Sequence, residues 1–410
     1  MDKIENQLGE IKEKYLRKMF DVLFGEREPQ NVIIQASFSL DDVRDIIFKI
    51  KGDYNINQVI FYDLDYERIK NFFGRNPNEE EVDRFIPKYP PLVGKTKVIY
   101  IRNDATDYLR EFNNKYSSQY HDGWKRINPE VYNAIFEGDK IDGINTATAV
   151  LPNIYWAKNL YGSEDKIVDL WKLMLEVTAT REELKESFDE LVEKSKELQS
   201  MNIHRLHFYT DLGTDFSILL TKYSLWLPTI KNIDEVYGGN IIETGVSTSP
   251  DCYSASGKVV LSQPRIDYTG LVTDTELTFE KGKIIDCKTD NEEFYRMVSY
   301  DKNRLNRIGE ILIVPHNNSL SAQAQSFMET HLSTDCGIVL GDRYHDGINL
   351  AEDICGKNVP EEKVRRALLA RHHNVSEWQL KYFFGDDSIS IEAETGGRQK
   401  VIMEKGIWKI

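Results

Sequence analysis

The chain has 410 residues, of which 40% are hydrophobic and 29% charged, with a formal net charge of −15. This length predicts two or three domains, and the composition is that of an ordinary globular protein. The acidic charge argues against nucleic acid as a partner, since phosphate binding requires a basic face. No run of 18 apolar residues is available to span a membrane.

The N-terminal segment, MDKIENQLGEIKEKYLRKMF, predicts a charged amphipathic helix without the apolar core of a signal peptide. The four cysteines have no CxxC spacing, which disfavours a structural zinc site and a disulfide framework. Scattered single cysteines are typical of a reducing compartment. We therefore expect a cytoplasmic protein that neither crosses a membrane nor binds nucleic acid.

Strand and helix signals alternate over roughly the first 150 residues. A helix is predicted over 39–52, with Ser39 as its N-cap and Gly52 just beyond its end. The predicted strands are 31–38, 57–65, 96–104 and 144–152. This alternation predicts an α/β N-terminal domain with a mostly parallel sheet covered by helices. No glycine-rich phosphate-binding sequence follows these strands, so the sheet is not expected to bind a nucleotide.

The character of the sequence changes after two helices that are expected within 163–200, the second of which is highly charged. Beyond them, apolar and polar residues alternate around turns such as Lys281-Gly282 and Gly396-Gly397, a pattern typical of hairpins. The sequence therefore predicts two domains: an α/β domain over 1–200 and a β-rich α+β domain over 201–410.

The segment RIGEILIVPHNNSL, residues 307–320, predicts a short strand that is buried on both faces. Glu310 lies at the start of its apolar run. A carboxylate there is either a strand-end residue that faces water or a buried group that needs a counter-charge or a cation. The partners available elsewhere in the chain decide between these interpretations.

Together with segments on both sides of it, this stretch resembles the thermophilic metallo-aminopeptidases of the aminopeptidase T and aminopeptidase S type. The resemblance rests on an ordered series of segments over most of residues 145–410. These are YWAKNLYG, LWKLMLEV, TDLGTDFSILL, GGNIIETGVSTSPD, LTFEKGKII, IGEILIVP, SFMETHLSTDCGIVLGDRY and NVSEWQLKYFFG. It implies the fold of that family, a homodimer with an internal cavity, and hydrolysis of N-terminal residues by two divalent metals such as zinc or cobalt.

The resemblance also assigns five metal-ligand positions, and this chain departs from the family at four of them. The glutamate of the IGEILIVP segment is present as Glu310, and a tyrosine of the family site is present as Tyr344. The other four positions carry residues that are not typical ligands for these metals. They are Gly245, Gly337, Gln379 and Lys381.

We therefore expect no metal cofactor and an ion pair between Glu310 and Lys381, because an ammonium can offset a carboxylate where a dication would otherwise lie. The protein is then a homologue without peptidase activity: a binding or scaffold protein, or a repurposed enzyme, with a peptide- or amino-acid-like ligand. A less favoured interpretation makes Lys381 a reactive amine with a lowered pKa.

The alternative is an active aminopeptidase with two divalent metals in a rearranged site. Glu243 lies two residues before Gly245 and would face the same way on an extended strand. It would be joined by Glu310 and by histidines from two nearby segments. These histidines are His345, His372 and His373. No ligand spacing connects these residues, and the ordinary interpretation is a strand-edge glutamate and loop histidines.

Overall fold

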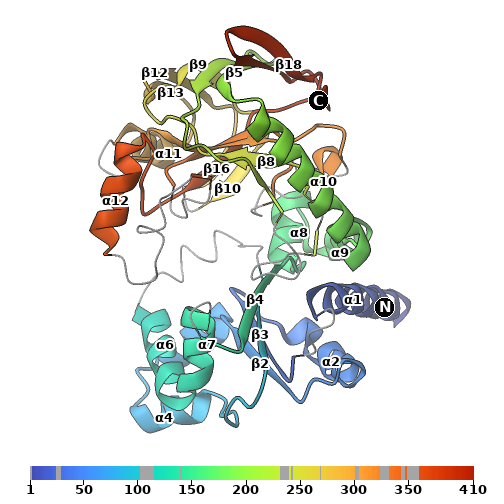
Figure 1. Ribbon diagram of the computed structural model, residues 1–410. Coiled ribbons are helices and arrows are strands. Elements are labelled where there is room, and N and C mark those ends of the chain that lie inside the picture. The colour runs from blue at the N-terminus through green and yellow to red at the C-terminus, as the bar shows by residue number, and fades with distance from the viewer. Residues whose placement is uncertain are drawn as a thin grey trace. The chain divides into compact units, whose positions relative to one another are not determined.

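The computed structural model describes most of the chain (Figure 1). The described ranges are 2–24, 29–101, 115–138, 141–230, 240–241, 243–267, 269–300, 304–318, 320–323, 332–342, 347–348 and 360–410. The chain divides into two compact units, each built from two segments. The first comprises Met1–Glu186 and Lys231–Ile242, and the second comprises Ser187–Ile230 and Glu243–Ile410.

The first unit contains a four-stranded parallel sheet with strand order β2-β1-β3-β4. Its strands are β1 (Asn31–Ala36), β2 (Gln58–Asp63), β3 (Thr96–Ile101) and β4 (Ile144–Ala149). The central strand β1 has Val32, Ile33 and Ile34 at 0–1% exposure, so both of its faces are covered. The predicted parallel, helix-covered sheet is confirmed.

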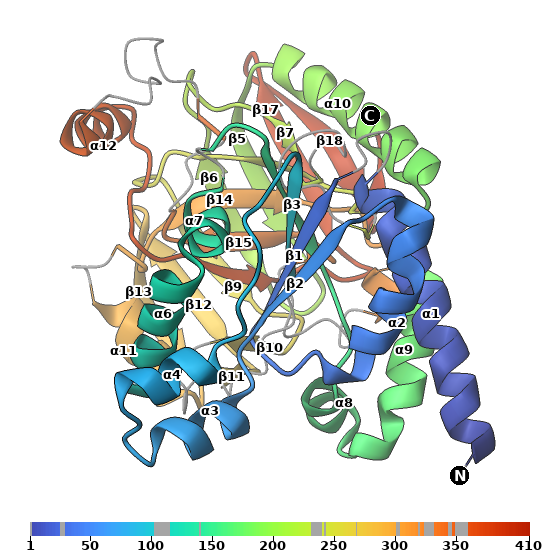
Figure 2. The same cartoon turned by 90° about the horizontal axis from the view of Figure 1, so that it is seen from below.

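Helices cover both sides of this sheet (Figures 1 and 2). On one side lie α1 (Asp2–Phe24) and α2 (Asp41–Ile50). On the other side lie α3 (Tyr66–Phe73), α4 (Glu79–Phe85), α6 (Lys115–Ile127) and α7 (Pro129–Glu137). The side chains of these four helices share one apolar cluster with the sheet, centred on Trp124 and Phe73. The unit also contains α8 (Ile154–Tyr161) and α9 (Ile167–Val177), and α10 (Arg181–Ser200) spans the boundary between the units.

The predicted N-cap of the helix over 39–52 is wrong. The helix begins at Asp41, and Leu40 occupies the N-cap position without a side-chain hydrogen bond. The Leu40 amide instead donates to the Asp63 carboxylate at 3.1 Å, and Arg44 also bonds Asp63 at 2.7 Å. The Ser39 hydroxyl accepts from the Asp41 amide at 3.4 Å, so the predicted residue still bonds the start of the helix, from one position before the N-cap, and the Asp63 carboxylate of the neighbouring strand adds the bond to Leu40.

The second unit is rich in antiparallel sheet. An eight-stranded sheet has the order β13-β12-β9-β6-β5-β17-β18-β19. Its strands are β5 (Ile203–Tyr209), β6 (Asp215–Leu219), β9 (Ser256–Val260), β12 (Glu276–Glu280), β13 (Lys283–Lys288), β17 (Ser390–Thr395), β18 (Arg398–Glu404) and β19 (Ile407–Trp408). Both predicted hairpin turns are confirmed: Lys281-Gly282 has φ of 50° and 76°, and Gly396-Gly397 has φ of 55° and 75°.

A second, five-stranded sheet has the order β16-β15-β14-β8-β7 and positions the residues discussed below. Its strands are β7 (Leu227–Pro228), β8 (Val246–Thr248), β14 (Ile308–Ile313), β15 (Gly337–Leu340) and β16 (Leu380–Phe383). The short strands β10 (Arg265–Asp267) and β11 (Gly270–Val272) pair with each other. The helices α11 (Glu292–Ser299) and α12 (Glu361–Ala370) complete the unit. No helix in the described part of the chain is long and apolar enough to cross a membrane.

Candidate functional site

Glu310 lies on β14, the central strand of the five-stranded sheet, next to β15 (Figure 2). Ile311, Leu312, Ile313 and Val314 are at most 2% exposed, so the predicted doubly buried strand is confirmed. The pairing of β14 with β15 shifts by one residue between Ile308 and Glu310, which marks a β-bulge at Gly309. A Cβ on Gly309 would lie 2.1 Å from the Gly341 carbonyl oxygen. The bulge therefore needs glycine, and it sets the face on which Glu310 lies.

Glu310 and Lys381 belong to one row across three strands. Glu310 on β14 is in register with Val339 on β15, and Val339 is in register with Lys381 on β16. Registered neighbours in a sheet share a face, and two strand spacings put the Glu310 and Lys381 Cα atoms roughly 9–10 Å apart. The sheet therefore presents both charged side chains on the same side, with a valine between them.

The Lys381 ammonium is surrounded by polar groups. It donates a hydrogen bond to the Ser333 hydroxyl at 3.1 Å, and the Ser333 amide donates to the Glu243 carboxylate at 2.9 Å. Burial lowers the pKa of Lys381 below its ordinary value, the carboxylates of Glu243 and Glu310 oppose this shift, and Arg265 adds to it. Two carboxylates and one ammonium thus interact electrostatically at the position where the resemblance assigns a metal.

Two of the five ligand positions have no room for a side chain. A Cβ on Gly245 would lie 2.4 Å from Val314 Cγ2, and a Cβ on Gly337 would lie 2.5 Å from the Tyr382 carbonyl oxygen and 2.9 Å from Phe383 Cδ1. Val314 and Phe383 belong to a buried apolar cluster with Leu312 and Val339. Apolar packing therefore occupies the space that ligand side chains at these two positions would need.

The remaining predicted residues do not gather around Glu310 in the described structure. Gln379 is partly exposed and lies two residues before Lys381. His372 is exposed and its Nδ1 lies 2.9 Å from the Asp251 carboxylate, while the buried His373 has Nε2 2.9 Å from Asp342. Tyr344 and His345 lie outside the described residues.

These observations test whether the residues present fit a metal. Among the described residues, no group of three or more histidine, cysteine, aspartate and glutamate side chains could hold a metal ion. Glu243 and Glu310 are suitable ligands, but both interact with a neighbouring ammonium, which repels a dication. The described donor set therefore does not fit the two-metal site that the resemblance implies.

Sequence reasoning missed Ser333 and the polar groups that follow it. Asp335 is fully buried, and burial raises its pKa to about 6, although hydrogen bonds with His316, Ser321 and Gln263 lower it. His316 Nδ1 lies 2.6 Å from its carboxylate. The segment Ser333-Thr334-Asp335 carries no recognisable spacing, and Ser333 reaches Lys381 through a separation of 48 residues.

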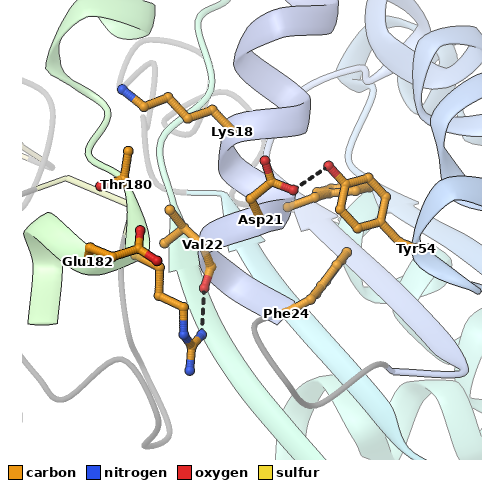
Figure 3. A pocket seen from close by; sticks show the side chains of 9 residues that line it. Lys18, Asp21, Val22, Phe24, Tyr54, Thr180 and Glu182 are labelled. Atoms are coloured by element: carbon orange, nitrogen blue, oxygen red, sulfur yellow. Dashed lines mark hydrogen bonds between the residues drawn. The ribbon is translucent and has the colours of Figure 1, made fainter.

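A pocket of about 380 Å³ lies in the first unit, between the end of α1 and the start of α10 (Figure 3). Several polar side chains of its lining bond neighbouring groups: Tyr54 donates to Asp21 at 2.8 Å, and Arg181 donates to the Val22 carbonyl at 3.3 Å. Lys18 bonds the Thr178 carbonyl. The Arg181 bond connects α10 with α1, and the other two bonds connect α1 with the turn at Tyr54 and with the end of α9, so the pocket has a structural explanation.

The parallel helix-covered sheet of one unit and the β-rich second unit also occur together in a solved structure. The chain matches the structure of wild-type AmpT from Thermus thermophilus with a TM-score of 0.70 and 18% sequence identity, over 99% of both chains. The model of the thermophilic metalloprotease (M29) family matches residues 13–408. The chain belongs to this family.

Two curated relatives agree with this assignment. Aminopeptidase PepS from Streptococcus thermophilus is 26% identical over 271 residues, which is 62% of this chain and 63%, less than two thirds, of that protein. Aminopeptidase AmpS from Bacillus subtilis (strain 168) is 22% identical over 418 aligned residues, covering 96% of this chain and 97% of that protein.

Proposed function

We propose that this chain is a member of the thermophilic metalloprotease family that does not hold two metals and does not hydrolyse N-terminal residues. It acts instead on a peptide- or amino-acid-like ligand, as a binding protein or as an enzyme with a different reaction. We also propose that it is cytoplasmic and forms a homodimer, in keeping with the family resemblance.

One observation carries this proposal. The side chain at position 381 is an ammonium that bonds Ser333 and interacts with Glu243 and Glu310. A protein-bound cation already offsets the carboxylates that would otherwise attract a metal. A peptidase of this kind needs its metals to polarise the peptide carbonyl and to lower the pKa of a bound water. An ammonium supplies neither function with comparable strength, because it carries half the charge and has no open coordination position.

The competing function is that of an active metal-dependent aminopeptidase with a rearranged site. The observation in its favour is that the carboxylates of Glu243 and Glu310 both act on the same cation, Lys381, so the same two carboxylates are available to a metal ion. This arrangement would require Lys381 to leave its hydrogen bond with Ser333. It would also require histidine ligands, yet His372 and His373 each lie at hydrogen-bond distance from an aspartate.

Hydrolysis assays distinguish the two functions. The purified full-length chain is incubated with leucinamide and leucine p-nitroanilide, with and without added zinc or cobalt. The proposal predicts no release of product above the rate measured without protein and no effect of a chelator. A robust rate that a chelator abolishes and zinc or cobalt restores would establish the competing function.

A further inference from the structure

The charged groups around Lys381 balance one another. Glu243 and Glu310 contribute two carboxylates, Lys381 and Arg265 contribute two cations, and the other three groups all act electrostatically on Lys381. Arg265 is 5% exposed, and its guanidinium lies 5.9 Å from the centre of the Phe383 ring. Among the described residues, these four formal charges sum to zero, so this part of the site is dipolar and not simply acidic or basic.

The charged residues of this group are more exposed than the apolar residues beside them. Glu243, Glu310 and Lys381 are each partly exposed, whereas the apolar residues Val339 and Phe383 of the same sheet are 1% and 3% exposed. The apolar side chains thus form the closed part of this sheet face, and the charged residues lie beside it. Recognition at this place depends on charge and hydrogen bonding more than on apolar contact.

We propose that this dipolar group binds the zwitterion of a free α-amino acid, with the ligand's α-ammonium against Glu310 and Glu243 and its α-carboxylate against Lys381 and Ser333. This inference rests on the proposed absence of metals and deepens it by naming the ligand class. A lysine in the place of a metal changes what is recognised, because an ammonium attracts a full carboxylate more strongly than a neutral amide carbonyl.

The charge balance explains why a zwitterion is preferred. A ligand with one positive and one negative charge inserts between Glu310 and Lys381 and leaves each of them with a partner. A ligand with a single charge separates the pair and satisfies only one member, which leaves a partly buried charge without a partner. Amino-acid amides, which are cations, and N-acetyl amino acids, which are anions, are therefore expected to bind at least about 10-fold more weakly, corresponding to about 1.4 kcal/mol.

The test uses the purified full-length chain in two stages. Thermal-shift measurements with the twenty common amino acids identify the one that stabilises the chain most. Calorimetry then compares that amino acid with its amide and with its N-acetyl derivative. We expect the free amino acid to bind at least about 10-fold more tightly than either derivative. Absence of any thermal shift, or equal binding of the amide, overturns the inference.

Variants assign the recognition to the proposed residues. Lys381→Met should remove the preference for the free acid over the amide, and Lys381→Arg should keep it because the cation is retained. Glu310→Gln should remove the preference over the N-acetyl derivative. Lys288→Met, an exposed lysine on β13, serves as the matched control and should change nothing. Retention of both preferences in Lys381→Met and Glu310→Gln refutes the assignment.

The two proposals fail in different ways. A metal-free chain that binds no amino acid contradicts the zwitterion site and leaves the absence of a two-metal site intact. Metal-dependent hydrolysis of leucinamide contradicts the proposed function itself. Circular dichroism of each variant, compared with the unmodified chain, confirms that a loss of binding reflects the site and not the fold.

Discussion

Replacing Lys381 by methionine removes the cation that faces Glu243 and Glu310 while keeping a long side chain in its place. Removal of one member of a fully buried ion pair costs about 3–5 kcal/mol, and removal of one member of a surface pair costs about 0–1 kcal/mol. The residues Glu243, Glu310 and Lys381 are each partly exposed, whereas the amine of Lys381 is buried, which places the expected loss between these limits. We therefore expect Lys381→Met to lower the free energy of unfolding by about 1–3 kcal/mol.

The double variant Lys381→Met/Glu310→Gln removes both charges and should recover at least half of that loss. Burial disfavours the charged form of Lys381, a cost that an uncharged pair of similar size does not carry. The assay is equilibrium urea unfolding of the unmodified chain, the two single variants and the double variant. We expect the coupling energy between Glu310 and Lys381 to be at least about 1 kcal/mol. The exposed pair Lys288 and Glu276, whose charged atoms are 3.1 Å apart, provides the matched control with little coupling. Additive losses in the double variant would refute the predicted Glu310–Lys381 ion pair.

Three further predictions concern packing, pH and assembly. Gly337→Ala should destabilise the chain by about 1–3 kcal/mol, because the added Cβ meets Tyr382 and Phe383. Gly9→Ala is the control and should not destabilise the chain, because no atom lies within 4 Å of the added Cβ. Thermal unfolding measures both variants. Burial raises the pKa of Asp335 to about 6, so the folded chain keeps this proton to a higher pH than the unfolded chain does. Stability from this group should therefore fall as the pH rises from about 4 through 6, and Asp335→Asn should abolish that fall in melts across this range. Sedimentation velocity at micromolar concentration should give a dimer; a monomer would contradict the proposed assembly.

Much of the fold follows from local pattern. The alternation of strand and helix signals predicts the parallel sheet. Turn-forming residue pairs such as Lys281-Gly282 predict the hairpins, and the structure gives both residues of that pair a positive φ. The apolar run after Glu310 predicts a strand buried on both faces, which the structure has. These features depend on residues that are close together in the sequence, where periodicity and turn chemistry are strong signals.

The environment of the site depends on contacts between distant segments and was harder to predict. The Ser333 contact with Lys381 and the Glu243 contact with the Ser333 amide join residues that are 48 and 90 positions apart. Position 245 could be identified as lacking a ligand, but the sequence does not indicate that Val314 fills the space beside it. Likewise, the pairing of His373 with Asp342 involves two segments without a shared motif.

The central claim is that this member of a metalloprotease family does not hold two metals, and elemental analysis tests it most directly. The full-length chain is purified without chelators, dialysed mildly and analysed for zinc, cobalt and manganese by mass spectrometry. The substituted ligand positions and the ammonium of Lys381 near Glu243 and Glu310 predict well under one equivalent of these metals in total per chain. Two tightly held metal ions per chain would contradict the account.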